Sequence, residues 1–222
     1  MEHLPALLYL LFAVTAILSL ALFLRAVGFS KILIALLSFW IILQSVLGIS
    51  AFYQVTAVIP PRFMLLVLPP VILIVITFLT KRGKAFIDGL DPGKLTILHI
   101  IRIPVEITLY WLFLHKAVPG IMTFEGRNFD ILCGITAPVV YYFGYIKNVL
   151  HKKVLLAWNI ICLLLLANIV STAVLSAPFP IQQFAFSQPN IALLYFPFVL
   201  LPGVIVPIVL FAHLVAIRKL IR

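Results

Sequence analysis

Two side chains of opposite charge, Arg102 and Glu106, stand four residues apart inside a long apolar run. Residues at this spacing share one face of an α-helix. An ionisable side chain deep in a membrane is costly unless it is paired or meets water, and it commonly lines a path for a substrate, ion or proton. We therefore predict that this face binds a ligand, with Glu106 as the ion-pair partner of Arg102. The candidate ligand-binding residues are His99, Arg102, Glu106 and Tyr110. A purely structural ion pair is the alternative.

Two histidines are candidates for a cofactor site. His99 follows Lys94 by five residues, and His213 precedes Arg218 by five residues, so we expect both imidazoles at one depth. Two facing imidazoles can bind a b-type haem, and a histidine with a carboxylate can bind a metal. Because the chain has no His-Glu-x-x-His motif, the cofactor stays unknown, with haem as one hypothesis.

A polar patch between two apolar runs holds Glu125, Arg127 and Asp130. A carboxylate is favoured in the first turn of a helix, so Asp130 is expected to cap the run that follows, and Arg127 is placed to pair with either acid. The patch is thus interpreted as a salt-bridged cap, or as the outer mouth of a site at Glu106. Cys133 and Cys162 also lie in apolar runs, and we expect them to be small core residues, with a disulfide or a ligand pair as the alternative.

The composition identifies the elements that must position these residues. Of 222 residues, 64% are hydrophobic and 10% are charged, against roughly 25% charged in a typical soluble protein. An apolar run of about 20 residues spans a membrane as a helix. We therefore predict an all-α integral membrane protein in which residues 1–222 form a single domain, a bundle of seven transmembrane helices. The predicted spans cover residues 4–24, 32–53, 63–80, 92–115, 129–147, 153–175 and 190–217.

The basic residues set the expected orientation. Only Arg62, Lys116 and Arg127 stand in the even-numbered connections, whereas the odd-numbered connections and the C-terminal tail hold the other basic residues outside the spans. Because cytoplasmic loops are rich in Lys and Arg, we expect the N-terminus outside and the C-terminus in the cytoplasm, in a plasma or inner membrane. Glu2 stands where a secretory signal carries a basic residue, so we expect the first run to be retained. The net charge of +10 is scattered between runs and predicts no nucleic-acid binding.

The last predicted span is interrupted by Pro197, Pro202, Gly203 and Pro207, so we expect it to be kinked or locally unwound beside a cavity. The connection before it, residues 176–189, is uncharged and contains three phenylalanines. We expect that connection to lie in the membrane interface or to fold over the bundle as a lid.

Seven spans invite comparison with retinal proteins and G-protein-coupled receptors, but the residues do not fit. The last span has no lysine before Lys219 for a Schiff base, and the chain lacks the Asn-Pro-x-x-Tyr motif. Three hypotheses stay open. The first is binding or transport of a small or lipid-like molecule, the second is a structural or accessory subunit with a protein partner, and the third is an intramembrane haem, redox or catalytic protein. We favour the first, because no catalytic or phosphate-binding constellation is present.

Overall fold

The computed structural model describes residues 4–222, and the regular secondary structure of this part of the chain is all helical; Glu2 lies outside it. The α-helices are α1 (Ala6–Val27), α2 (Lys31–Ile49), α3 (Met64–Leu79), α4 (Lys81–Asp88), α5 (Pro92–Leu98), α6 (Arg102–Leu114), α7 (Ile131–Tyr141), α8 (Lys152–Leu175) and α9 (Val206–Ile221). Short 3₁₀ turns occur at Phe52–Gln54, His99–Ile101, Gly120–Met122 and Ala192–Leu194, and π-helical turns at Tyr142–Ile146 and Leu201–Ile205.

Five helical segments are long and apolar enough to cross a membrane: α1, α2, Pro92–Leu114, α8 and Leu201–Ile221. A sixth is added if α3 and α4, which meet at 88°, count as one broken span. The run predicted over residues 129–147 is helical only as Ile131–Ile146, which is shorter than the rest. The chain is thus a polytopic helical membrane protein with five or six spans by length and composition.

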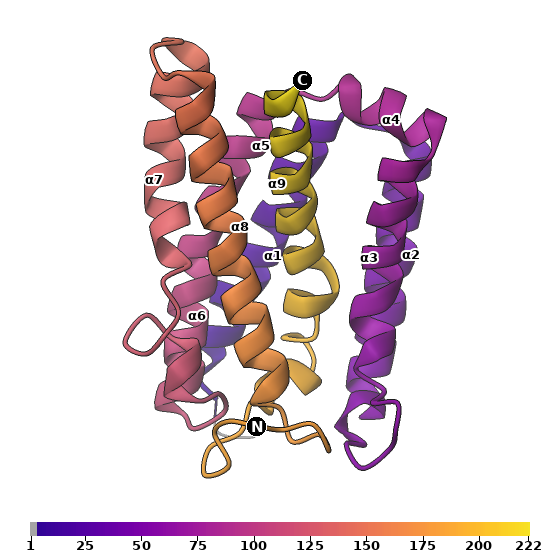
Figure 1. The fold of residues 1–222 in the computed structure, drawn as a ribbon. Coiled ribbons are helices and arrows are strands. Elements are labelled where there is room, and N and C mark those ends of the chain that lie inside the picture. Colours follow the sequence, from indigo (N-terminus) through magenta and orange to yellow (C-terminus); the bar gives the residue numbers. More distant parts are fainter. Residues whose placement is uncertain (1–3) are drawn as a thin grey trace.

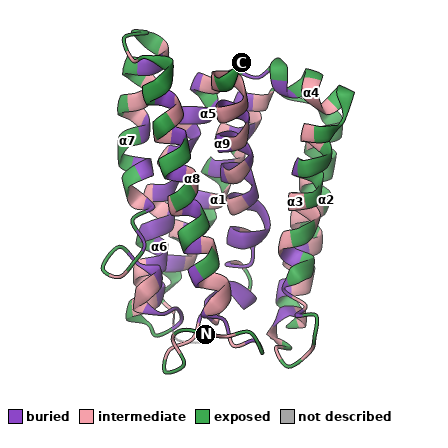
Figure 2. Ribbon diagram, viewed as in Figure 1, coloured by how far each residue is buried: buried purple, intermediate pink, exposed green. Residues whose placement is uncertain are grey.

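The helices stand side by side as an upright bundle (Figure 1). Helix α9 packs against α8 and α5, and α1 packs against α5 and α6, so these elements form the centre of the molecule. Helices α2 and α3 stand together at one side, and α4 lies across the end of the bundle at which the chain finishes. Burial follows this arrangement, since α9 is buried along most of its length while α2 is mostly exposed (Figure 2).

The span made of α5 and α6 carries the polar face predicted from the sequence. It begins as expected, because Asp91 Oδ1 accepts hydrogen bonds from the N–H groups of Gly93 (2.8 Å) and Lys94 (3.4 Å). The span changes to a 3₁₀ turn at His99–Ile101. Pro104 accounts for this change, because it has no N–H to donate to the carbonyl of residue 100 and its ring crowds that carbonyl.

The last span begins later than predicted. Residues 190–200 are irregular apart from the turn at Ala192–Leu194, and the helix starts only at Leu201, with a π-helical turn. The predicted departure from a regular helix is therefore confirmed, as turns around Pro197 and as a π-helical turn that contains Pro202 and Gly203. The indole Nε1 of Trp40 on α2 donates to the carbonyl of Gly203 (2.8 Å), which keeps this loosened backbone satisfied.

The uncharged connection before the last span folds against the helix ends. Phe179 is buried, and the Gln188 amide donates to the carbonyls of Val118 (2.6 Å) and Phe113 (3.1 Å). Residues 176–189 thus close one end of the bundle, and a role for them as a moving lid stays a prediction.

Candidate functional site

Arg102 is the centre of a polar cluster inside the bundle. Its side chain is almost fully buried, and its Nη1 lies 2.6 Å from Asp130 Oδ1 at the start of α7. The same Nη1 lies 3.4 Å from the carbonyl oxygen of Cys162 on α8, and Nη2 lies 2.9 Å from His213 Nε2 on α9. One guanidinium from α6 therefore binds groups on α7, α8 and α9.

The predicted ion pair between Arg102 and Glu106 is wrong, because Asp130 takes the place of Glu106. Asp130 is expected at an aqueous helix cap, yet its side chain is buried beside the guanidinium. Its backbone N–H donates to Asn128 Oδ1 (3.1 Å), so the segment before α7 is folded into the protein interior. Helix α7 is short and begins partway along the bundle (Figure 1), and Asp130, the residue before it, is buried.

Glu106 has a different environment from the one predicted. Its Oε1 accepts a hydrogen bond from the Nδ2 group of Asn128 (2.5 Å), and the same amide also donates to the carbonyl of Met122 (3.0 Å). Its Oε2 is buried and has no hydrogen-bond partner among the described residues. Glu106 forms no ion pair within residues 4–222, so it is the carboxylate of the cluster that has unused acceptor capacity.

Asn128 was not among the predicted site residues. It stands within the polar patch between Glu125 and Asp130, and it is fully buried. Its carboxamide is the only side chain in residues 4–222 that bonds to Glu106. The sequence offered one signal for Asn128, its position among charged residues before a short apolar run. That signal does not show that the side chain points into the protein.

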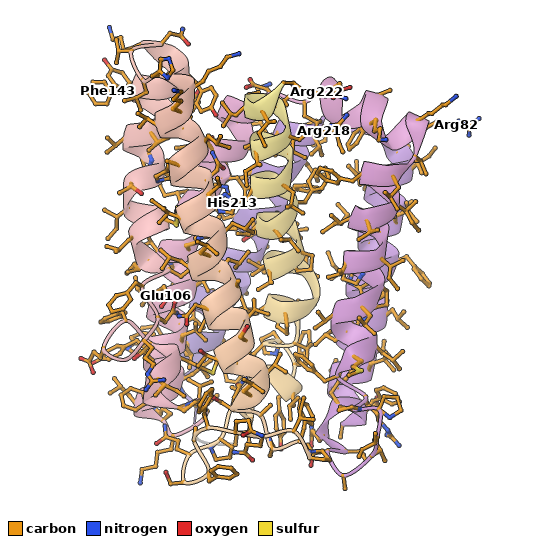
Figure 3. The ribbon with its side chains drawn as sticks, in the orientation of Figure 1. Arg82, Glu106, Phe143, His213, Arg218 and Arg222 are labelled. Carbon is orange, nitrogen blue, oxygen red and sulfur yellow. A yellow bond between two sulfur atoms is a disulfide. The ribbon has the colours of Figure 1, made fainter. Side chains whose placement is uncertain are left out.

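His99 and His213 lie at one depth, as predicted, and their rings stack with centroids 3.8 Å apart and planes 13° from parallel. The ring of Trp158 packs against both, at 5.7 Å from His99 and 5.9 Å from His213. Stacked rings at this distance leave no space for a macrocycle between them, so the geometry does not fit a haem with two histidine ligands. Figure 3 shows His213 inside the bundle and Glu106 at another level of it.

The hydrogen bonds of His213 fix its tautomer. Arg102 can only donate, so Nε2 of His213 is the acceptor and Nδ1 carries the proton. That proton is donated to Asn159 Oδ1 (3.0 Å), while the Asn159 amide donates to the carbonyl of Leu155 (2.9 Å). His213 is therefore neutral and fully used in positioning Arg102. The Nδ1 atom of His99 is buried without a partner among the described residues.

Tyr110 and the outer polar residues do not join the cluster. The Tyr110 hydroxyl bonds to Glu125 Oε1 (3.2 Å) at an exposed position. The backbone carbonyl of Arg127 accepts a hydrogen bond from the Asn168 amide (2.9 Å). In the described part of the chain, no ion pair joins Arg127 to Glu125 or Asp130. The predicted salt-bridged patch is thus divided: Asp130 belongs to the buried cluster, and Glu125 and Arg127 belong to the surface.

A disulfide joins Cys133 on α7 to Cys162 on α8. The interpretation of these cysteines as separate core residues is therefore wrong, although both side chains are buried as expected. The bond fixes α7 to α8 next to the atoms that Arg102 binds, because the Cys162 carbonyl is one of its acceptors. A cross-link of this kind typically stabilises a fold by about 2–4 kcal/mol.

A cavity of about 70 Å³ adjoins the carboxylates. Glu106 and Asp130 are its charged lining residues, and the remaining walls are apolar side chains of α3, α6, α8 and the last span. Within residues 4–222 no group of three metal-ligating side chains is assembled here or elsewhere. The site is therefore an apolar cavity with one carboxylate neutralised by Arg102 and a second that is not.

No known protein family, curated protein or solved structure matches the chain. The site is accordingly interpreted from its own geometry.

The pairing of Arg102 can be tested by removing one acid at a time. Asp130→Asn leaves a buried guanidinium without its counter-ion, so we expect the free energy of unfolding to fall by about 3–5 kcal/mol. Glu106→Gln keeps an acceptor for Asn128, so it should lower the free energy of unfolding by much less. The measurement is thermal unfolding of the purified variants in one detergent.

The double variants make the test specific. Arg102→Met with Asp130→Asn removes both charges and should recover most of the lost stability. Arg102→Met with Glu106→Gln leaves Asp130 buried and unpaired, so it should not recover. If Arg102→Met with Glu106→Gln recovered more stability than Arg102→Met with Asp130→Asn, Glu106 would be the partner of Arg102.

Proposed function

We propose that this membrane protein binds a small or lipid-like molecule through its buried site, and that a hydrogen-bond donor or positive charge on this molecule meets Glu106. The observations that support this function most directly are the unpartnered Oε2 atom of Glu106 and the apolar-walled cavity that this residue lines. A buried carboxylate oxygen without a donor is costly, and a ligand that supplies the donor removes this cost.

The polarity of the site limits the chemical class of the ligand. The Nη1 and Nη2 atoms of Arg102 donate to Asp130, His213 and a backbone carbonyl, and Asp130 neutralises the charge, whereas the Nε atom has no partner among the described residues. A carboxylate or phosphate ligand, when ionised, has no proton to donate to the unpartnered Oε2 atom of Glu106. An amine or a hydroxyl on an apolar body fits both the acceptor and the walls. A volume of about 70 Å³ holds the polar end of such a molecule rather than all of it.

The proposal includes the topology expected from the sequence. We propose seven spans, with the α3–α4 pair and the shorter Ile131–Ile146 segment each counted as one. The N-terminus then lies outside and the C-terminus in the cytoplasm of a plasma or inner membrane, since the basic residues gather at the C-terminal end. Transport, rather than binding alone, would use the loosened backbone at Leu201–Ile205 beside the cavity.

A structural or accessory subunit is the second candidate. It is favoured by the way Arg102 contacts α7, α8 and α9 at once, which is what a residue that only locks helices would do. In that case the double variant Arg102→Met with Asp130→Asn would keep full cellular function, because stability is all that the pair supplies.

Ligand binding at Glu106 can be tested by native mass spectrometry of the gently extracted protein. We expect the wild type to carry an additional organic mass. The fraction of protein that carries this mass should be at least about tenfold lower in Glu106→Gln. Glu125→Gln is the matched control, because it removes the same charge from an exposed glutamate. The control should keep the additional mass.

A second probe covers ligands lost on extraction. Hexylamine should raise the unfolding temperature of the wild type and of Glu125→Gln but not that of Glu106→Gln, whereas hexanoate should raise none of them. Equal responses of Glu106→Gln and the wild type to both probes would contradict the proposed site.

The orientation can be tested with single thiols, because Cys133 and Cys162 are both in the disulfide. Ser187→Cys and Ala85→Cys place exposed thiols at opposite ends of the bundle. In intact cells, a membrane-impermeant maleimide should label Ser187→Cys at the outer surface and leave Ala85→Cys unlabelled until the cells are opened. Labelling of Ala85→Cys alone in intact cells would reverse the proposed topology.

A further inference from the structure

A second, larger cavity lies apart from the polar cluster, between the α2–α3 pair and the α1–α9 side of the bundle. Its volume is about 360 Å³, and its walls are almost wholly apolar. Helix α2 contributes little to the core, and Figure 1 shows α2 and α3 set apart from α9. We call this cavity the lateral groove. None of its lining residues belongs to the cavity at Glu106.

The lateral groove runs between its two walls toward the end of the bundle across which α4 lies. The hydrogen bond from Trp40 to the Gly203 carbonyl joins its two walls at the inner end. Phe211 on α9 and Phe86 on α4 line the other end. Gly203 and Phe211 are eight residues apart, which is about 12 Å along a helix. This length is close to the hydrocarbon depth of one leaflet, about 15 Å.

Basic side chains stand on α4 and near the end of α9, at the end of the bundle toward which the groove runs. Lys81 and Arg82 on α4 are exposed, and Lys84 is half-buried. Arg218 follows Phe211 by seven residues and thus lies on the same face of α9. Figure 3 shows Arg82 and Arg218 at this end of the molecule. This end of the bundle is therefore strongly positive.

Asp88, at the end of α4, offsets only part of this positive charge. Asp88 bonds to Arg222 through both carboxylate oxygens (2.8 and 2.9 Å), and the Arg218 Nε lies 3.5 Å from its Oδ1. The Arg218 Nη2 atom is buried and has no hydrogen-bond partner among residues 4–222. That guanidinium therefore has donors that no protein acceptor uses.

We propose that the lateral groove binds an anionic phospholipid of the adjacent leaflet, with one acyl chain along the groove and the phosphate on the basic residues of α4 and α9. The apolar walls match a hydrocarbon chain, the length matches one leaflet, and the positive end matches the headgroup charge. A neutral lipid could pack its acyl chain against the apolar walls but would carry no net negative charge for the basic residues. This inference does not depend on the proposed function at Glu106.

Quenching of Trp40 fluorescence tests the proposal, because this indole lines the groove. Trp111→Phe and Trp158→Phe leave Trp40 as the only tryptophan, in a protein reconstituted into bilayers. Phosphatidylglycerol and phosphatidylcholine with the same brominated acyl chains are the two quenchers. We expect phosphatidylglycerol to quench at roughly fivefold lower mole fraction, the factor that about one basic contact supplies.

Two further variants show whether the preference comes from the groove. Replacing Lys81, Arg82 and Lys84 by Gln should abolish the preference for phosphatidylglycerol. Replacing Lys152 and Lys153 by Gln, at the start of α8 and away from the groove lining, should preserve it. Thr77→Phe partly fills the groove and should weaken quenching by both lipids.

Equal quenching of the wild type by the two lipids would overturn the proposal. So would an equal loss of preference in the α4 and α8 variants, because that result would indicate a general surface potential instead of a site. Circular dichroism of each reconstituted variant confirms that the compared proteins are folded.

Discussion

A guanidinium buried in the middle of a membrane protein is the constraint on which the rest of this structure depends. Arg102 cannot remain charged in an apolar bundle unless other segments bring acceptors to it. Asp130, the Cys162 carbonyl and His213 meet this need from three different helices. The position of α6 relative to α7, α8 and α9 is therefore specified by one side chain as well as by apolar packing.

Several irregular features support this arrangement. Helix α7 is short, so that Asp130 lies at the depth of Arg102, and Asn128 folds inward with it. The disulfide between Cys133 and Cys162 fixes α7 to α8 beside the same atoms. Asn159 holds His213 in the tautomer that accepts from Arg102. Because Asp130 neutralises the guanidinium, Glu106 keeps one carboxylate oxygen without a hydrogen-bond partner and lines an apolar cavity. These two features are the basis of the proposed binding function.

The sequence predicted the helical class, most helix positions and the polar face of the α5–α6 span, because apolar periodicity and the Asp91-Pro92 cap are local signals. The equal depth of His99 and His213 was also predictable from their distances to flanking basic residues. These features need no knowledge of how the helices pack.

The pairings within the site were not predictable. Asp130 and Arg102 are 28 residues apart in the sequence. Glu106 is only four residues from Arg102, so it is the obvious partner unless the inward fold of the segment before α7 is known. The same holds for Cys133 and Cys162, since a bond between two helices depends on their rotation. The late start of the last helix was missed because residues 190–200 are apolar yet irregular, and apolar character alone does not separate a span from a packed loop.

The most direct test of this account is an electron cryomicroscopy structure of the wild-type protein in a lipid nanodisc, at a resolution that shows side chains. The account predicts the Arg102 guanidinium against Asp130 and His213, with Glu106 facing a cavity that holds additional density at its free oxygen. A guanidinium turned to Glu106, with Asp130 at the aqueous surface and the cavity filled by protein, would contradict it.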